Sequence, residues 1–332
     1  MMLLAISDIH GKVESVRQLR ERVTNGFNAI VVAGDIGKDF DTTVQVFDIL
    51  NSYGCPVLYV YGNWDHSLTY DHHFGSNCHH LHNACFTLGG WTFAGYSGVA
   101  ENWGHNPLAA SITADLDARY DAGLAEIDSR VEALEREERE ILAACESLPS
   151  LPNKAHLRPV WPLRRRLSNL REKREQLELV LQAEYRKGYK EIGAANRREL
   201  ADRISGLAER TIVVTHGRLT RTAEDMPDVP LFLFGHTHGF TDTQIGRSRF
   251  VNVSALDHLV PVMPEGETER HRKHMRSADL GAFAVIEIGR GIKVQSFPLR
   301  VMPPGWKRVS GSTIGHGYKP LGQEDVPSTI VW

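Results

Sequence analysis

The chain of 332 residues contains 42% hydrophobic and 24% charged residues and has a formal net charge of −3. This composition is that of a globular protein with one large domain or two, and the near-neutral balance argues against a protein devoted wholly to nucleic acid or to an anionic membrane surface. No stretch approaches the roughly 18 apolar residues of a membrane span. The apolar start Met1–Ser7 is too short for a signal peptide.

The four cysteines lack the paired spacing of zinc sites and are too few for a disulfide framework. They fit a reducing compartment. We therefore expect a cytoplasmic protein with no membrane partner.

The first sixty residues alternate short apolar runs with amphipathic segments. We expect strands at Leu3–Ser7, Ala29–Ala33 and Val57–Tyr61, with helices at Val13–Arg22 and Val44–Asn51 between them. Strand, helix and strand with short connections are typical of parallel βαβ units, which bind ligands beyond the carboxyl ends of their strands.

Polar side chains follow each of these three strands. Asp8 and His10 follow the first, Asp35 follows the second, and Asn63 follows the third within Gly62-Asn63-Trp64-Asp65-His66. Because the carboxyl ends of parallel strands meet at one edge of a sheet, we expect these side chains to lie together. The next loop is rich in histidine, and we expect most of its imidazoles to be solvated: His66, His72, His73, His79, His80 and His82.

Further strands supply further histidines. The run Pro230–Phe234 leads into Gly235-His236-Thr237-His238, and Thr211–Thr215 leads into His216-Gly217-Arg218. A hairpin around Gly89-Gly90 predicts a second, more antiparallel sheet. The remaining expected elements are a helix over Asn196–Ala208 and strands at Arg249–Val253, Ala282–Ile288 and Ile292–Phe297, with a loop over Asp257–Asp279.

The middle of the chain has a different pattern. From Ile112 to Leu148, and again from Leu163 to Leu181 beyond a proline-rich turn, apolar residues recur at steps of three and four. This heptad seam predicts two helices packed as an antiparallel coiled-coil hairpin. Residues 111–150 hold eleven acidic and four basic side chains, whereas residues 154–203 hold fourteen basic and seven acidic ones.

These opposite charges favour pairing of the two arms, and we predict a contact between Glu138 and Arg174. The hairpin has two interpretations: an arm for a protein partner or for self-association (or a lid), or an insertion that only enlarges the fold. The basic run from Arg164 to Arg174 either binds nucleic acid or pairs with the acidic side chains of the first helix.

The side chains at the strand ends form a set suited to metal binding. Two carboxylates, four imidazoles and one amide suit two divalent ions of intermediate softness, with Mn²⁺ as the first choice and Fe²⁺ or Zn²⁺ as alternatives. A carboxylate such as Asp35 can bridge two ions ~3.5–4 Å apart. The candidate ligands are Asp8, His10, Asp35, Asn63, His216, His236 and His238.

As an ordered series, Asp8-x-His10, Gly34-Asp35, Gly62-Asn63-x-Asp65, His216 and Gly235-His236-x-His238 resemble the motifs of the calcineurin-like metallophosphoesterases, in their prokaryotic-type phosphodiesterase branch. The resemblance implies an α/β fold, a sandwich of two mixed β-sheets flanked by helices. It divides the chain into catalytic halves at 1–110 and 191–300, the hairpin insertion at 111–190, and a tail at 301–332.

The same resemblance implies a division of the ligands. Asp8, His10 and His238 would hold one ion, Asn63, His216 and His236 the other, and Asp35 would bridge them. It also implies hydrolysis of a phosphate ester by a hydroxide held on the dinuclear centre, and two cations would help to neutralise the phosphoryl charge.

The third position of the Gly62-Asn63-Trp64-Asp65 motif departs from the resemblance. The family usually has histidine where this chain has Trp64, and indole cannot act as a general acid. The substrate's leaving group then needs little protonation, or His66, His105 or Arg218 takes over, or Trp64 stacks on a base or sugar of a nucleotide, or it only packs under the loop.

We therefore expect a phosphodiesterase acting on a phosphate ester, with nucleotide or nucleic acid as possible substrate classes. Asp65 would orient the loop or a ligand. The candidate catalytic residues are Asp35, Asn63, Asp65, His66 and Arg218. One alternative is a nuclease for DNA or RNA ends, which would need the basic face of the second hairpin helix and the basic loop Arg270–Arg276 to line one groove towards the metals. The other is a non-catalytic scaffold that binds a partner through the hairpin.

Overall fold

The computed structural model describes the chain in two compact units, Met1–Asn106 with Gly193–Trp332, and Pro107–Ile192. The residues it leaves undescribed are 25, 38, 66, 69–70, 99–106, 147–159, 219–221, 257–258, 263–274, 279–280, 301–305, 310–316 and 321–332. His66, His105 and most of the basic loop from Arg270 therefore lie outside the described residues. No helix of the described chain is long and apolar enough to cross a bilayer.

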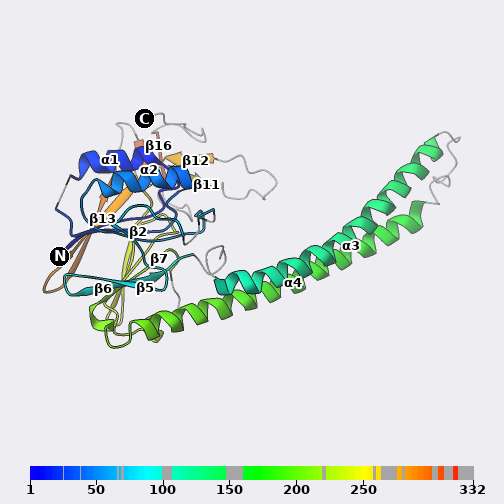
Figure 1. Cartoon of the computed structure of the whole chain (residues 1–332). Helices are drawn as coiled ribbons and strands as arrows, with labels where there is room; N and C mark the ends of the chain where they lie inside the picture. The colour runs from blue at the N-terminus through cyan, green and yellow to red at the C-terminus, as the bar shows by residue number, and fades with distance from the viewer. Residues whose placement is uncertain are drawn as a thin grey trace. The chain divides into compact units, whose positions relative to one another are not determined.

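The first sheet of the larger unit has six strands in the order β14-β13-β1-β2-β3-β4 (Figure 1). Strands β1 to β4 run parallel, and β13 and β14 are antiparallel to their neighbours. The bounds are β1 Met2–Ile6, β2 Ala29–Ala33, β3 Val57–Val60, β4 Cys78–His80, β13 Ala282–Ile288 and β14 Ile292–Pro298.

Two helices cover one face of this sheet, α1 (Val13–Arg22) and α2 (Phe40–Asn51). Helix α2 begins where the Asp39 side chain accepts a hydrogen bond from the Thr42 backbone N–H, a typical N-cap. Apolar side chains of both helices, including Leu19 and Phe47, share one buried cluster with Leu4 and Ile30 of the sheet. The expected βαβ units are confirmed.

The second sheet also has six strands, in the order β5-β6-β7-β8-β10-β9. Its inner pairs β6–β7, β7–β8 and β8–β10 are parallel, so the expectation of a more antiparallel sheet was wrong. The hairpin β5–β6 was predicted correctly, but it forms an edge, as β9–β10 does. The bounds are β5 Ala84–Leu88, β6 Trp91–Tyr96, β7 Thr211–Thr215, β8 Leu231–Phe234, β9 Thr241–Ile245 and β10 Ser248–Asn252.

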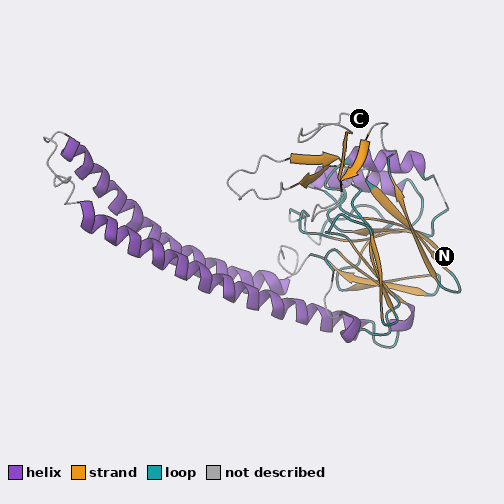
Figure 2. Cartoon of the chain, turned by 180° about the vertical axis from the view of Figure 1, so that it is seen from behind, coloured by secondary structure: helices purple, strands orange, loops and turns teal. Residues whose placement is uncertain are grey.

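A second apolar core lies between the two sheets. Alternate side chains of β1 and β2, such as Leu3 and Val31, pack with Ile212 and Leu233 of the second sheet. The fold is thus two mixed six-stranded sheets flanked by helices (Figure 2), as expected for the fold class.

Segments expected as loop and tail contribute a third, four-stranded sheet in the order β11-β12-β16-β15. These strands were missed because they are short and carry no strong alternation of apolar residues. Their bounds are β11 Leu259–Val262, β12 Met275–Ala278, β15 Trp306–Val309 and β16 Gly317–Pro320. The short α5 (Thr222–Asp225) and a 3₁₀ turn, η2 (Ala208–Arg210), complete the larger unit.

The smaller unit consists of two long helices lying side by side (Figure 1), α3 (Pro107–Glu146) and α4 (Val160–Arg203, which continues into the larger unit). Leu134 packs with Leu163, Leu167 and Leu170 in a buried seam, so the expected helical insertion is present. The separate helix expected over Asn196–Ala208 is instead the end of α4. Gly193, which costs about 1 kcal/mol in a helix, does not interrupt it.

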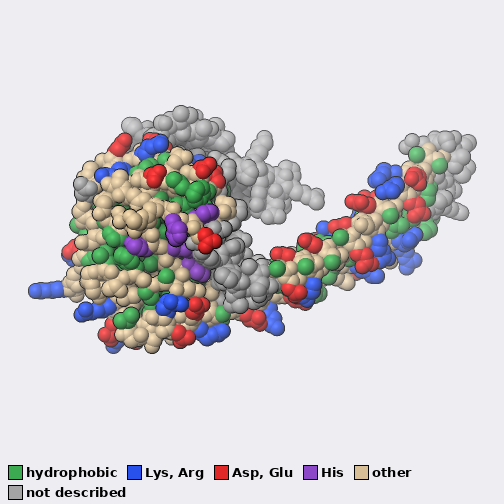
Figure 3. Space-filling model, viewed as in Figure 1, with side chains coloured by type: hydrophobic (Ala, Val, Ile, Leu, Met, Phe, Trp, Pro, Cys, Tyr) green, Lys and Arg blue, Asp and Glu red, His purple; other side chains and the backbone are tan. Residues whose placement is uncertain are grey.

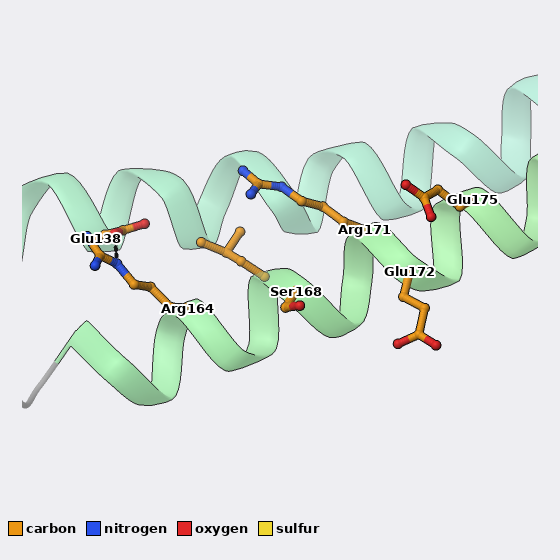
Figure 4. Close-up of a pocket in the computed structure, with 7 residues that line it drawn as sticks. Glu138, Arg164, Ser168, Arg171, Glu172 and Glu175 are labelled. Atoms are coloured by element: carbon orange, nitrogen blue, oxygen red, sulfur yellow. Dashed lines mark hydrogen bonds and ion pairs between the residues drawn. The ribbon is translucent and has the colours of Figure 1, made fainter.

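The predicted pair of Glu138 and Arg174 is wrong. Glu138 accepts a hydrogen bond from Arg164 Nε at 2.7 Å (Figure 4), and Arg174 Nε donates to Asp128 at 2.9 Å. Both pairs are centred on residue 151, which sets the register of the two antiparallel helices. In this register Arg174 lies ten residues beyond the position opposite Glu138, or about 15 Å along the helix. The prediction had placed the turn too late in the chain.

Candidate metal centre

The loops that follow five parallel strands bring the candidate ligands together. Among the described residues, their ligand atoms form two groups within which all lie less than 4.8 Å apart. One group is Asp8, His10 and His238, and the other is Asp8, Asp35 and His216. Histidine side chains are also visible together on the face of the larger unit shown in Figure 3.

The carboxylate of Asp35 lies between histidines of both groups. Its Oδ2 is 3.2 Å from His10 Nε2 and 3.3 Å from His216 Nε2. Its Oδ1 accepts the backbone N–H of Trp64 at 2.8 Å. One oxygen that faces two imidazoles is in the position that a bridging ligand needs.

The ring of His216 is oriented from behind. Its Nδ1 donates to the carbonyl of Ala33 at 2.8 Å, which leaves Nε2 as the atom that can bind a cation. Asn63 Oδ1 lies 3.1 Å from this Nε2, and the ring of His236 meets that of His216 edge-on at 5.2 Å between centroids. Asn63 and His236 thus lie beside His216.

The carboxylate of Asp8 is fully buried and held by its own neighbours. Its Oδ2 accepts from Ser7 Oγ at 2.6 Å and from the backbone N–H of His236 at 3.0 Å. Its Oδ1 is 3.4 Å from His238 Nε2. The sequence offered no signal for Ser7, which is an ordinary serine at the end of a strand.

The electrostatics of the centre follow from charges packed out of water. Burial alone would raise the pKa of Asp35, but the charge of His216 and hydrogen bonds from His10 and His216 hold it well below its usual range. Burial alone would lower the pKa of His216. The negative charge of Asp35 outweighs this effect of burial and raises the pKa of His216 to about 9. A proton on His216 therefore competes with a cation at neutral pH.

The candidate ligands also carry backbone strain. Seven non-glycine residues of the described chain have φ in the left-handed region, and five of them are candidate ligands. Such conformations are costly and cluster at functional sites, although Asp and His adopt them more readily than most residues. The five are Asp8, His10, Asp35, His236 and His238, with φ of 50°, 49°, 52°, 68° and 56°.

Three glycines allow the loops to approach closely. A Cβ at Gly62 would collide with the Asp35 carboxylate, and one at Gly34 would collide with the His216 ring. At Gly235, a Cβ would collide with the side chains of Ser7 and Asp8. The motif glycines are thus required by packing around the ligands.

Asp65 lies behind the centre and joins two of its loops. It is fully buried and accepts backbone N–H groups of Ile36, Gly37 and Gly62 at 2.7–3.0 Å. Burial, with Asp35 nearby, raises its pKa to about 6. These contacts are those of a positioning residue and involve no substrate.

Two positioning residues were missed. Asn252 Nδ2 donates to the carbonyl of Gly235 at 2.7 Å, and Ser254 Oγ donates to the carbonyl of His238 at 3.0 Å. Asn252 is the last residue of β10 and Ser254 lies two residues beyond it; β10 pairs with β8, so both residues hold the turn that carries His236 and His238. Their position at the end of a strand was the available signal.

The other candidate residues lie in varied surroundings. Arg218 is exposed, and its guanidinium lies over the ring of Phe250, 5.7 Å from the centroid. Two of the loop histidines expected to be solvated are half-buried and hydrogen-bonded: His80 Nε2 lies 2.8 Å from Ser97 Oγ, and His82 Nδ1 accepts the Ser97 backbone N–H.

Fold and site together define an α/β two-sheet protein with a cluster of metal-ligand type at the strand ends. Residues 1–123 match the family model of the calcineurin-like phosphoesterase superfamily domain. This part of the chain is therefore similar to that domain, as the motifs predicted, and the match supports a phosphoric ester hydrolase. No curated protein matches the sequence.

Solved structures show a weaker likeness. The protein TT1561 of Thermus thermophilus aligns over 90% of this chain and 99% of its own, at 13% identity and a TM-score of 0.43. Phosphopantetheinyl hydrolase from Mycobacterium tuberculosis aligns over 76% of this chain and 89% of its own, at 17% identity and a TM-score of 0.36. Because both TM-scores are below 0.5, these likenesses carry no argument here.

Proposed function

We propose that this chain hydrolyses a phosphodiester at a centre of two divalent ions, with Mn²⁺ as the preferred metal. The observation that carries the proposal is the pair of ligand groups that share Asp8, together with Asp35, whose Oδ2 faces a histidine of each group. The donor set of carboxylates, imidazoles and one amide fits such ions.

The residues fit two ions as follows. Asp8, His10 and His238 would hold one, Asn63, His216 and His236 would hold the other, and Asp35 would contact both. When bound, two such ions lower the pKa of water and neutralise charge on the phosphoryl oxygens. The chain's own part is to fix the ligands, since Ser7 and the Ala33 carbonyl set the directions of Asp8 and His216.

The choice of a diester rests on Trp64 and on the resemblance. The indole cannot protonate a leaving group. General acid catalysis typically contributes about 10²–10⁴ in rate, so a substrate whose leaving group needs little protonation suits this centre best.

Hydrolysis of an aryl phosphodiester beside its monoester tests the proposal. Metal-stripped protein is compared with and without Mn²⁺, and Asp35→Asn is compared with Asp225→Asn, a control carboxylate that pairs with Arg197. We expect Mn²⁺-dependent turnover that favours the diester, is lost in Asp35→Asn and is kept in Asp225→Asn. Turnover that is independent of metal, or that survives in Asp35→Asn, would contradict the proposal.

We also propose that the hairpin is a docking arm for a protein partner or for a second copy of the chain. The protein would be cytoplasmic, with domain boundaries at residues 110, 190 and 300. Its support is its length and its many charged side chains. Deletion of residues 111–190 should keep turnover and abolish assembly. If the deletion variant keeps both turnover and assembly, the insertion has no docking role.

A further inference from the structure

The indole of Trp64 lies beside the candidate metal centre and is open to solvent. Trp64 is 48% exposed, which is high for a large apolar ring. Its ring centroid lies 4.9 Å from that of His10, with the two planes tilted by 56°. The indole thus contacts a candidate ligand and still has free surface for another group.

Hydrogen bonds fix the main chain that carries this ring. The backbone N–H of Trp64 donates to Asp35 Oδ1, and the next residue, Asp65, is anchored in the interior by three backbone N–H groups. None of these bonds uses the indole. Replacing the ring therefore leaves the hydrogen bonds of the loop in place.

The chemistry of indole limits the role of Trp64. Its one polar group is an N–H donor, so the side chain neither transfers a proton at neutral pH nor binds a cation through a lone pair. Its flat face, by contrast, stacks on planar aromatic groups, and bases stack on such rings with little regard to sequence.

The distances indicate how far a stacked group lies from the phosphate. The indole contacts His10, and the Nε2 of His10 in turn lies 3.2 Å from Asp35 Oδ2. A ring stacked on the indole would therefore lie beside the candidate ligands and not on the ligand atoms themselves. This separation suits a base joined to phosphate through a sugar better than an aryl ring bonded to the phosphate oxygen.

We propose that Trp64 determines specificity by stacking on the nucleobase of a nucleotide ester, so that the site selects nucleotides over simple sugar or alkyl phosphates. The proposal rests on the proposed function for the reaction at the phosphate, but it concerns binding and is tested by binding.

The test compares two ligands that differ in the base. They are the phosphonate analogues of adenosine 5′-monophosphate and of ribose 5-phosphate, in which a methylene group replaces the bridging oxygen and prevents hydrolysis. Calorimetry on the Mn²⁺-loaded full chain gives both affinities for wild type, Trp64→Ala and Trp64→Phe. The control is Trp161→Ala, which removes another exposed tryptophan, 56% exposed, on the hairpin.

We expect wild type to bind the adenosine analogue roughly 5–150-fold more tightly than the ribose analogue. This ratio should fall to near one in Trp64→Ala, be largely kept in Trp64→Phe, and be unchanged in Trp161→Ala. Equal affinities in wild type, no binding of either analogue, or an equal loss for both ligands in Trp64→Ala would overturn the proposal. Base-dependent binding without turnover of any ester would refute the proposed reaction and leave the role of Trp64 standing.

Discussion

At the scale of single residues, the candidate metal centre requires glycine at three positions where any side chain would collide with a neighbouring residue. Gly34, Gly62 and Gly235 precede candidate ligands, and at each of them a Cβ would collide with a neighbouring ligand side chain. A motif glycine here is a condition for placing carboxylates and imidazoles in contact.

Gly235→Ala tests this directly. The added methyl group must displace Ser7 or Asp8, so we expect metal affinity to fall and stability to drop by about 1–3 kcal/mol, as for overpacking in general. Gly289→Ala is the matched control, because a Cβ there meets nothing within 4 Å. Mn²⁺ titration measures the metal affinity of both variants, and urea unfolding measures their free energy of unfolding. Equal metal affinity and equal stability of the two variants would refute the role of close packing.

The raised pKa of His216 predicts a pH dependence of the metal-free protein. Its folded pKa of about 9 exceeds the ordinary value of 6.5, because Asp35 stabilises the imidazolium despite burial. The protonated ring therefore adds stability that is complete below about pH 6.5 and is lost as the pH rises through about 9.

Urea unfolding of the metal-stripped protein between pH 6 and 10 measures this effect as the difference between wild type and His216→Gln. The difference should shrink with rising pH. A difference that is constant over this range would contradict the assignment.

At the scale of elements, the hairpin shows what a heptad pattern determines. The apolar steps predicted both helices and the seam at Leu134, Leu163 and Leu167. They did not give the register, because the proline-rich turn left the midpoint of the hairpin open by several residues. The predicted pair of Glu138 and Arg174 was wrong for this reason.

A double-mutant cycle tests the observed register. Alanine substitutions at Glu138 and Arg164 should couple by roughly 0.2–1 kcal/mol, as for exposed ion pairs. The same cycle at Glu138 and Arg174 should give no coupling, because Arg174 pairs with Asp128. Unfolding of the full chain in low salt is the readout, and coupling only in the second cycle would contradict the register.

At the scale of the whole molecule, the βαβ half and the gathering of polar side chains at the strand ends could be predicted, because buried parallel strands appear as apolar runs and deliver polar residues to one edge. The parallel interior of the second sheet could not, since strand direction there depends on connections as long as the one from β6 to β7. The third sheet and the hydrogen bond from Asn252 to Gly235 depend on tertiary contacts, whose partners the sequence pattern does not specify.

The central claim is a pair of adjacent metal ions that share Asp35. Electron paramagnetic resonance of the Mn²⁺-loaded chain, with metal content measured on the same sample, tests it most directly. We predict two ions per chain and the spectrum of a coupled pair, with coupling lost in Asp35→Asn, since bridged ions lie ~3.5–4 Å apart. One ion per chain, or the six-line spectrum of isolated Mn²⁺ in the wild type, would contradict the account.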